Sequence, residues 1–214
     1  MATTEEMDRM YRWTRHVYDF SRKYYLLGRD RLLREMDLHP GDRVVEIGCG
    51  TARNLIKLAR MRPDVRCFGL DVSTEMLATA TAKVKSRRLQ DRITLALCFA
   101  EQFDYAKTFQ LDAPLEAAFF SYSLSMIPPF KEAIDAALAN VRRGGEIYVV
   151  DFWDQGGWPR WFRFLITGWL NLFHVHHRPE LLEYLQELDA RGVGSLTLKP
   201  VARRYAYLAT FRKL

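Results

Sequence analysis

The chain has 214 residues, of which 49% are hydrophobic and 27% are charged, values that are ordinary for one soluble globular domain. Its longest apolar stretch, residues 164–173, is shorter than the ~20 residues that a bilayer-spanning helix needs, which argues against a membrane span. The net charge of +6 favours acidic partners, among them anionic lipid surfaces, nucleic acid and charged substrates.

The N-terminal residues MATTEEMDRM contain no apolar run, so we expect no signal peptide. The cysteines Cys49, Cys67 and Cys98 are odd in number and show no metal-ligand spacing, so we expect them to be reduced thiols of a cytoplasmic protein. No repeat or second domain is evident. Residues 1–214 are therefore predicted to form a single domain.

Residues 5–36 are predicted to be helical, with Gly28 as the one point where the helix could break. One face of this helix carries tyrosines that recur every seven residues, namely Tyr11, Tyr18 and Tyr25. Core packing is the simpler explanation of this row. The alternative is that residues 1–38 form a helical lid over a ligand and bring one tyrosine near the reacting atoms.

The stretch from Arg43 to Asp71 is predicted to be the unit around which the chain is organised. It contains a β-branched strand, a glycine-rich turn, a helix with apolar residues at helical spacing and a second strand, at 44–47, 48–52, 53–60 and 67–70. The second strand ends on Asp71. Such a unit binds a nucleoside-containing ligand at the carboxyl ends of parallel strands.

Individual positions of this unit indicate the kind of ligand. Gly48 and Gly50 allow a sharp turn and leave no side chain between the main chain and the ligand. Asp71 offers two acceptor oxygens to a ribose diol. The dinucleotide fingerprint G-x-G-x-x-G would place glycine at position 53, where this chain has Arg53. The acid Glu46 before the turn suits a cationic ligand better than a pyrophosphate.

The remaining chain continues to alternate strands and helices. Ser73 is predicted to cap a helix, and the pair Gly144 and Gly145 is predicted to end another at 130–143. Further strands are expected at 92–97, 115–120 and 146–152, a helix is expected to begin at Pro179, and the runs 194–200 and 202–212 alternate like an antiparallel hairpin.

The run Glu46-Ile47-Gly48-Cys49-Gly50-Thr51, followed by Asp71, resembles the cofactor motif of class I S-adenosylmethionine-dependent methyltransferases. Ala52 stands where the third glycine of that motif is usual. The resemblance implies an α/β fold: a Rossmann-like seven-stranded methyltransferase sheet with flanking helices, an N-terminal helical lid and a C-terminal antiparallel hairpin. An unrelated nucleotide-binding Rossmann unit is the alternative.

The resemblance also implies that the loop cradles the methionine portion of S-adenosylmethionine and that Asp71 holds its ribose. In the family an acid that contacts the adenine amino group commonly stands at the position of Phe99, so here Glu101 or a backbone carbonyl would replace it. The cofactor-binding residues expected in this way are Glu46, Gly48, Cys49, Gly50, Asn54, Asp71, Val72, Met76, Ala100, Glu101 and Ser121.

Stretches outside residues 46–51 resemble one particular group within this family. They are Tyr18-Asp19, residues 22–30 (RKYYLLGRD), residues 121–128 (SYSLSMIP), Val150-Asp151-Phe152 and residues 158–162 (WPRWF). These stretches are similar to the bacterial betaine-lipid N-methyltransferases of the BtaB type. Those enzymes trimethylate the amino group of diacylglycerylhomoserine to give diacylglyceryl-trimethylhomoserine. The resemblance implies S-adenosylhomocysteine as the product and a partner enzyme that supplies the lipid.

A lipid acceptor would require the enzyme to work at the inner face of the membrane. The aromatic and basic segment 153–178 suits an interface, and basic residues attract anionic phospholipid headgroups. The alternative for residues 158–173 is a helix packed on its own sheet or in a dimer. Methyl transfer needs no metal, so we expect none at the histidines His174, His176 and His177.

Transfer of a methyl group to an amine is an in-line attack by a neutral nitrogen, so positioning matters more than a strong base. Tyr25 and Tyr122 are the candidates for orienting the amine as hydrogen-bond acceptors. His16 and Asp151 are weaker candidates for accepting its proton. The residues expected to bind the substrate are Tyr18, Arg29, Asp151 and Arg160.

Rival functions are methyl transfer to a soluble amine, a quinone or nucleic acid, and a cofactor-binding scaffold without catalysis. No RNA-binding module or aromatic-basic repeat is evident, so nucleic acid is not expected as a partner. The intact motif from Glu46 to Asp71 argues against the scaffold.

Overall fold

The computed structural model describes residues 26–154, 156–158 and 178–214. The helices are α2 (Arg29–Glu35), α3 (Arg53–Met61), α4 (Thr74–Ser86), α5 (Tyr105–Phe109), α6 (Phe130–Asn140) and α8 (Pro179–Ala190), with short 3-10 turns η1 (Ala100–Gln102) and η2 (Leu124–Met126). The strands are β1 (Arg43–Ile47), β2 (Arg66–Asp71), β3 (Ile93–Leu97), β4 (Leu115–Ser121), β5 (Val141–Phe152), β6 (Gly194–Val201) and β7 (Ala206–Lys213).

The strands form one seven-stranded sheet in the order β3-β2-β1-β4-β5-β7-β6. Strands β1 to β5 are parallel, whereas β7 is antiparallel to both β5 and β6. The terminal antiparallel hairpin expected from the alternating runs is thereby confirmed. The strand order reverses direction between β1 and β4, and ligands of open α/β sheets bind at such a switch point.

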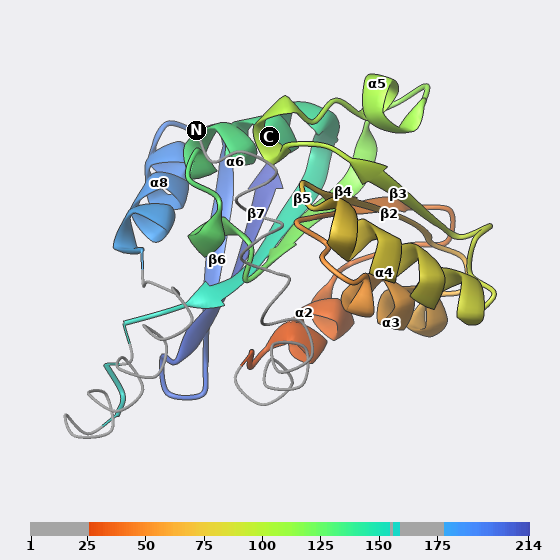
Figure 1. Cartoon of the computed structure of the whole chain (residues 1–214). Coiled ribbons are helices and arrows are strands. Elements are labelled where there is room, and N and C mark those ends of the chain that lie inside the picture. Colours follow the sequence, from red (N-terminus) through yellow and green to blue (C-terminus); the bar gives the residue numbers. More distant parts are fainter. Residues whose placement is uncertain (1–25, 155, 159–177) are drawn as a thin grey trace.

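Helices cover both faces of the sheet (Figure 1). One core joins α2, α3 and α4 to the sheet through buried side chains such as Leu33, Leu55 and Ala80. The other core joins α5, α6 and α8 to the opposite face through residues such as Phe109 and Ile134. This two-faced burial explains why β1 and β4 consist of almost continuous apolar residues instead of alternating ones.

The prediction that a helix covers 130–143 is wrong at its C-terminal end. The helix α6 stops at Asn140, and Val141 already pairs with Leu115 of β4. The Asn140 amide donates hydrogen bonds to the carbonyls of Phe103 and Ala136, which ends the helix one turn early. The glycine pair lies inside β5, where the register with β4 shifts.

One further boundary differs from the sequence prediction. The last strand begins at Ala206 and not at Ala202, because residues 202–204 have positive φ angles of 45°, 54° and 66° and form the turn of the hairpin. The helix break predicted as possible at Gly28 is confirmed, because Gly28 has a φ of 88° and α2 begins at Arg29.

Several residues singled out by the sequence lie outside the described part of the chain. They are Tyr11, His16, Tyr18, Tyr25, Arg160, His174, His176 and His177, together with most of the predicted lid and of the segment 153–178. Their proposed roles therefore stay predictions. Within the described ranges, no helix is long and apolar enough to cross a membrane.

Candidate active site

The glycine-rich loop after β1 is held against the end of β2. The amides of Gly48 and Cys49 both donate to the Leu70 carbonyl at 2.9 Å. The Gly50 amide donates to Oδ2 of Asp71 at 2.7 Å, and the Ser73 amide donates to its Oδ1 at 3.0 Å. Asp71 therefore fixes the loop, and its contact with a ribose diol stays a prediction.

Gly48 is required for packing as much as for ligand access. A Cβ atom at this position would lie 2.5 Å from Cβ of Ser123, and the φ angle is 78°. The hydroxyl of Ser123 donates to the Ile47 carbonyl at 2.7 Å, so the segment after β4 closes directly onto the loop after β1. This adds a second reason for glycine to the one that the sequence suggested.

Glu46 at the end of β1 is the acid that the sequence associated with a cationic ligand. It is 2% exposed, and its Oε1 accepts a hydrogen bond from Nδ2 of Asn54 at 2.7 Å. Its Oε2 has no hydrogen-bond partner among the described residues. Burial raises the pKa of Glu46 to about 8. An unpartnered carboxylate oxygen in this position fits the ammonium group of S-adenosylmethionine.

Asn54 is among the residues expected to contact the cofactor, and its side chain links Glu46 to a series of charged residues. Arg53 donates to Oδ1 of Asn54 at 3.0 Å and pairs with Asp30 of α2 at 2.6 Å. Lys57 also pairs with Asp30. Burial by itself raises the pKa of Asp30. The hydrogen bonds from Arg53 and Lys57 outweigh burial and lower this pKa to about 2. Helix α2 is thereby tied to the helix that follows the cofactor loop.

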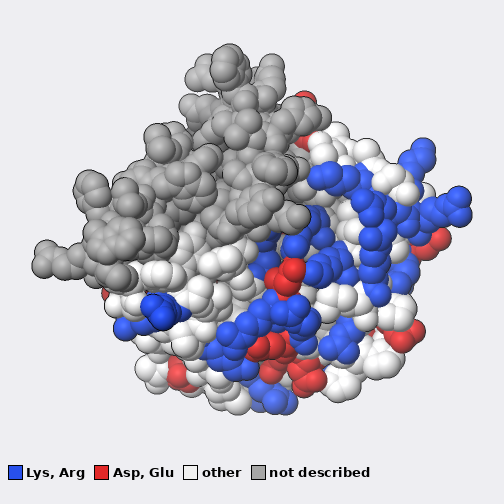
Figure 2. Space-filling view, turned by 90° about the horizontal axis from the view of Figure 1, so that it is seen from below, with Lys and Arg blue, Asp and Glu red and all other residues white. Residues whose placement is uncertain are grey.

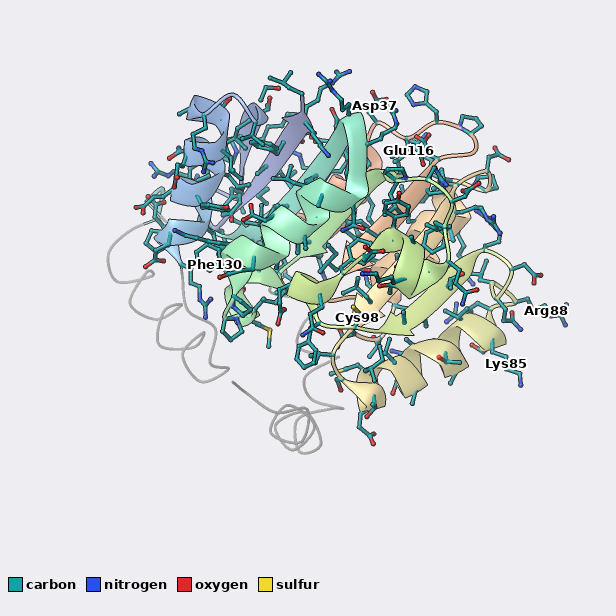
Figure 3. All side chains as sticks on the ribbon, turned by 90° about the horizontal axis from the view of Figure 1, so that it is seen from above. Asp37, Lys85, Arg88, Cys98, Glu116 and Phe130 are labelled. Carbon is teal, nitrogen blue, oxygen red and sulfur yellow. The ribbon has the colours of Figure 1, made fainter. Side chains whose placement is uncertain are left out.

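The loop after β3, which begins at Cys98 (Figure 3), is the segment expected to lie beside the adenine. The Cys98 amide donates to the Asp71 carbonyl at 3.1 Å, which brings this loop beside β2. Phe99 is 37% exposed, so its ring is available to a ligand. Val72 and Glu101 are half-buried, whereas Met76 and Ala100 are buried. The Ser73 hydroxyl accepts from the Met76 amide at 3.3 Å, which confirms the predicted cap of α4.

Tyr122 follows β4 and has a left-handed backbone with φ of 58°. Its side chain is 3% exposed, and its hydroxyl donates to the Leu27 carbonyl at 2.5 Å. Burial raises the pKa of Tyr122 well above its usual value, so the phenol stays protonated. Its oxygen can still accept one hydrogen bond, as the predicted role requires. Arg29, the first residue of α2, lies close enough to influence both Tyr122 and Glu46.

Asp151, near the end of β5, is a buried carboxyl with 1% exposure. Its Oδ1 accepts from the Phe152 amide at 2.8 Å, and its Oδ2 accepts from the Ser125 amide at 3.1 Å. Burial raises the pKa of Asp151 to about 6, against the effect of these two hydrogen bonds. The residue predicted to bind substrate thus lies at the same edge of the sheet as the cofactor loop.

Some residues of this edge were not identified from the sequence. Ser125, Tyr207 and Arg178 surround Asp151 but come from η2, β7 and the start of α8. Ser125 lies in the stretch 121–128 that the resemblance singled out, but no motif marks Tyr207 or Arg178, and the pairing of β5 with β7 is what brings Tyr207 to Asp151. No group of three or more His, Cys, Asp or Glu side chains suited to a metal ion occurs among the residues that the structure describes.

Comparison with known proteins agrees with this geometry. Residues 44–145 match a family model described as a methyltransferase domain. A demethylmenaquinone methyltransferase of Beutenbergia cavernae is 27% identical over 197 residues, which cover 84% of this chain and 75% of the relative. The 27-O-demethylrifamycin SV methyltransferase of Amycolatopsis mediterranei is 29% identical over 58% of this chain. The chain spans only 43% of the length of that enzyme and 61% of the methyltransferase GfsG of Streptomyces halstedii.

Solved structures share the fold over almost the whole chain. The [4+2]-cyclase SpnF has a TM-score of 0.74 at 17% identity and covers 99% of this chain and 96% of its own. The S-adenosylmethionine-dependent methyltransferase SibL has a TM-score of 0.70 at 19% identity and covers 92% of this chain and 57% of its own. A cyclase and a methyltransferase with one fold illustrate that the fold alone does not determine the reaction.

The fold, the loop between Glu46 and Asp71 and the family match together define the class of protein. Residues 44–145 match a methyltransferase domain, and the sheet has the strand order of the class I methyltransferase fold. The match implies S-adenosylmethionine as the cofactor, and the contacts of Glu46 with its ammonium and of Asp71 with its ribose stay predictions.

Proposed function

We propose that this protein transfers methyl groups from S-adenosylmethionine to the amino group of diacylglycerylhomoserine, giving the trimethylated betaine lipid. The similarity of residues 22–30, 121–128 and 158–162 to betaine-lipid N-methyltransferases supports this acceptor. The main support for an amine as acceptor is the position of Asp151. Its buried carboxyl lies at the same edge of the sheet as the loop after β1 and favours a cationic partner. The acceptor is an ammonium both before and after each transfer.

The residues of the chain would act mainly by positioning. S-adenosylmethionine supplies an electrophilic methyl group on a sulfonium. Glu46 and Asp71 hold the cofactor at its two polar ends, while the oxygen of Tyr122 accepts a hydrogen bond from the acceptor nitrogen. Holding nitrogen and methyl in line removes much of the entropic barrier. The carboxylate of Asp151 faces the ammonium and takes up the proton that the nitrogen must lose.

A lipid acceptor further requires contact with a membrane, and the charge distribution supports an anionic one. The parallel strands end toward the lower side of Figure 1. Figure 2 views that side and shows Lys and Arg over much of the described surface, with a few acids among them. Helix α3 contributes Arg53, Lys57 and Arg60 and no acidic residue of its own, although Arg53 and Lys57 pair with Asp30 of α2. Each basic residue near an anionic surface contributes about 1 kcal/mol.

Methyl transfer to a quinone is the second candidate. Relatives over most of the chain carry the name demethylmenaquinone methyltransferase, among them proteins of Beutenbergia cavernae and Corynebacterium glutamicum. A quinone acceptor is also membrane-bound, so membrane binding alone does not distinguish a quinone from the homoserine lipid. The charge of the acceptor group distinguishes them.

The deciding experiment supplies purified protein with radiolabelled S-adenosylmethionine and vesicles that contain either diacylglycerylhomoserine or a demethylmenaquinone. We expect label in mono-, di- and trimethylated homoserine lipid, identified by mass, and none in the quinone. Label in the quinone alone would reject the amine acceptor. Flotation with anionic and with zwitterionic vesicles tests the membrane contact separately, and equal flotation with both would remove the electrostatic contribution.

A further inference from the structure

Unpartnered polar atoms gather at the carboxyl edge of the sheet. The buried side-chain atoms without a hydrogen-bond partner among the described residues include Glu46 Oε2, Ser121 Oγ, Ser125 Oγ and Tyr207 Oη. Buried polar atoms in folded proteins are almost always hydrogen-bonded, so such atoms indicate a missing ligand or water. The cofactor ammonium accounts for Glu46. The hydroxyls of Ser125 and Tyr207 have no counterpart in the cofactor.

These two hydroxyl groups flank Asp151. Tyr207 of β7 stands directly opposite Asp151 of β5 in the antiparallel register, so both side chains project from the same face of the sheet. The ring of Tyr207 packs edge-on against Trp153, with the ring centroids 6.0 Å apart. Ser125 lies beside Asp151, and hydrogen bonding from its amide and its side chain lowers the pKa of that carboxyl, although its Oγ has no other partner among the described residues. Tyr207 and Ser125 are 2% and 6% exposed.

The group around Asp151 lies near Tyr122. After burial, the groups that influence the pKa of the Tyr122 phenol are Tyr205, Asp151, Arg29 and Tyr207. Arg29 also influences Glu46 on the cofactor side. Asp151 and Tyr207 therefore lie near the segment that leaves β4, and Arg29 lies close enough to influence both this segment and Glu46.

We propose that Asp151, Ser125 and Tyr207 form the subsite for the amino group of the acceptor, and that this subsite discriminates acceptors by the number of their N–H bonds. The inference rests on the proposed function, because it assumes an amine acceptor. A primary ammonium has three N–H donors, and the carboxylate and the two hydroxyl oxygens, together with the oxygen of Tyr122, supply acceptors for all of them.

Each cycle removes one N–H bond. The nitrogen gives a proton to the carboxylate of Asp151, and its lone pair then forms the new N–C bond while the S–C bond breaks with its electron pair on sulfur. The carboxyl returns the proton to water before the next cycle. After the third transfer no N–H bond remains, so the oxygens of Ser125 and Tyr207 lose their partners. The subsite therefore releases the quaternary product.

Removal of the two hydroxyl groups tests the subsite. The Tyr207 hydroxyl has no hydrogen-bond partner among the described residues, whereas the Ser125 side chain interacts with the Asp151 carboxyl. We expect Tyr207→Phe and Ser125→Ala each to raise the KM of unmethylated short-chain diacylglycerylhomoserine about tenfold, the loss of one hydrogen bond to a charged group. The KM of the dimethylated substrate should change far less, because its ammonium has only one N–H bond to donate. The Kd of S-adenosylmethionine should stay unchanged in both variants, and the thermal unfolding midpoint should stay unchanged in Tyr207→Phe.

The matched control is Tyr184→Phe, whose hydroxyl donates to Asp135 at 2.6 Å on α6. It should lower the unfolding midpoint and leave every KM unchanged. Equal KM values for wild type and both site variants, or equal losses at all methylation stages, would overturn the subsite. If wild type methylates no homoserine lipid, the proposed function fails by itself. Thermal shifts with the headgroup amine and S-adenosylhomocysteine then test the subsite alone, and equal shifts for wild type and Tyr207→Phe overturn it.

Discussion

The substitution Glu46→Gln tests how the domain binds the charged end of its cofactor. In the ligand-free protein the pKa of Glu46 is about 8, because the carboxyl is buried. Contact with an ammonium requires the ionised form. Below pH 8 the protein must therefore release a proton to bind, and each pH unit costs about 1.4 kcal/mol, a factor of ten in affinity. We expect the Kd of S-adenosylmethionine to fall about tenfold between pH 6 and pH 7.

The glutamine variant keeps the size of the side chain and loses both the charge and the titration. Its Kd at pH 7.5 should be about ten- to a hundredfold weaker, the range of one hydrogen bond to a charged group. The pH dependence between 6 and 7.5 should disappear. Isothermal calorimetry in buffers of different ionisation enthalpy would measure both the Kd and the number of protons released.

Methylthioadenosine is the control ligand, because it lacks the amino-acid end and should bind both proteins equally at every pH. The charged or titratable groups around Glu46 are Arg29, Asp71, Arg53 and Cys49. Asp151, with a pKa of about 6, also titrates in this range. Any pH dependence of the Kd that remains in the glutamine variant would be due to Asp151. An unchanged slope in Glu46→Gln, or a flat profile for the wild type, would refute the reasoning.

Three further predictions concern the same loop. Asp71→Ala should weaken S-adenosylmethionine binding by calorimetry, because it removes the ribose acceptors and also the anchor of the Gly50 amide; equal affinity would contradict the ribose role. Gly48→Ala should destabilise the fold by about 1–3 kcal/mol in urea unfolding, because its Cβ would overlap Ser123, and Ser123→Gly in the same chain should restore part of the loss. The raised pKa of Glu46 means that the native state holds a proton that the unfolded state releases above pH 4.5. The free energy of unfolding of the wild type should therefore fall relative to Glu46→Gln as the pH rises from 4.5 to 8, and an unchanging difference would contradict the buried carboxyl.

The cofactor half of the site was largely predictable from the sequence. Its signals are local: a β-branched run, two glycines, a capping serine at Ser73 and an acid at the tip of the second strand, all between Arg43 and Ser73. The acceptor half was predicted only in part. Asp151 and Tyr122 were identified through a resemblance, whereas Tyr207 was not, because nothing near it in the chain marks its hydroxyl as unusual.

The sequence by itself determined the succession of strands and helices along the chain, the turn after Ile47 and the cap at Ser73. Periodicity and backbone hydrogen bonding act over a few residues, so these features are local. Only the tertiary structure decided where α6 ends, since the Asn140 side chain bonds to the Phe103 carbonyl far back in the chain. It likewise decided that Gly48 must accommodate Ser123, and that Tyr207 faces Asp151 across β5 and β7. Such contacts depend on strand order and register, and these are set when distant segments pack together and bury both faces of the sheet.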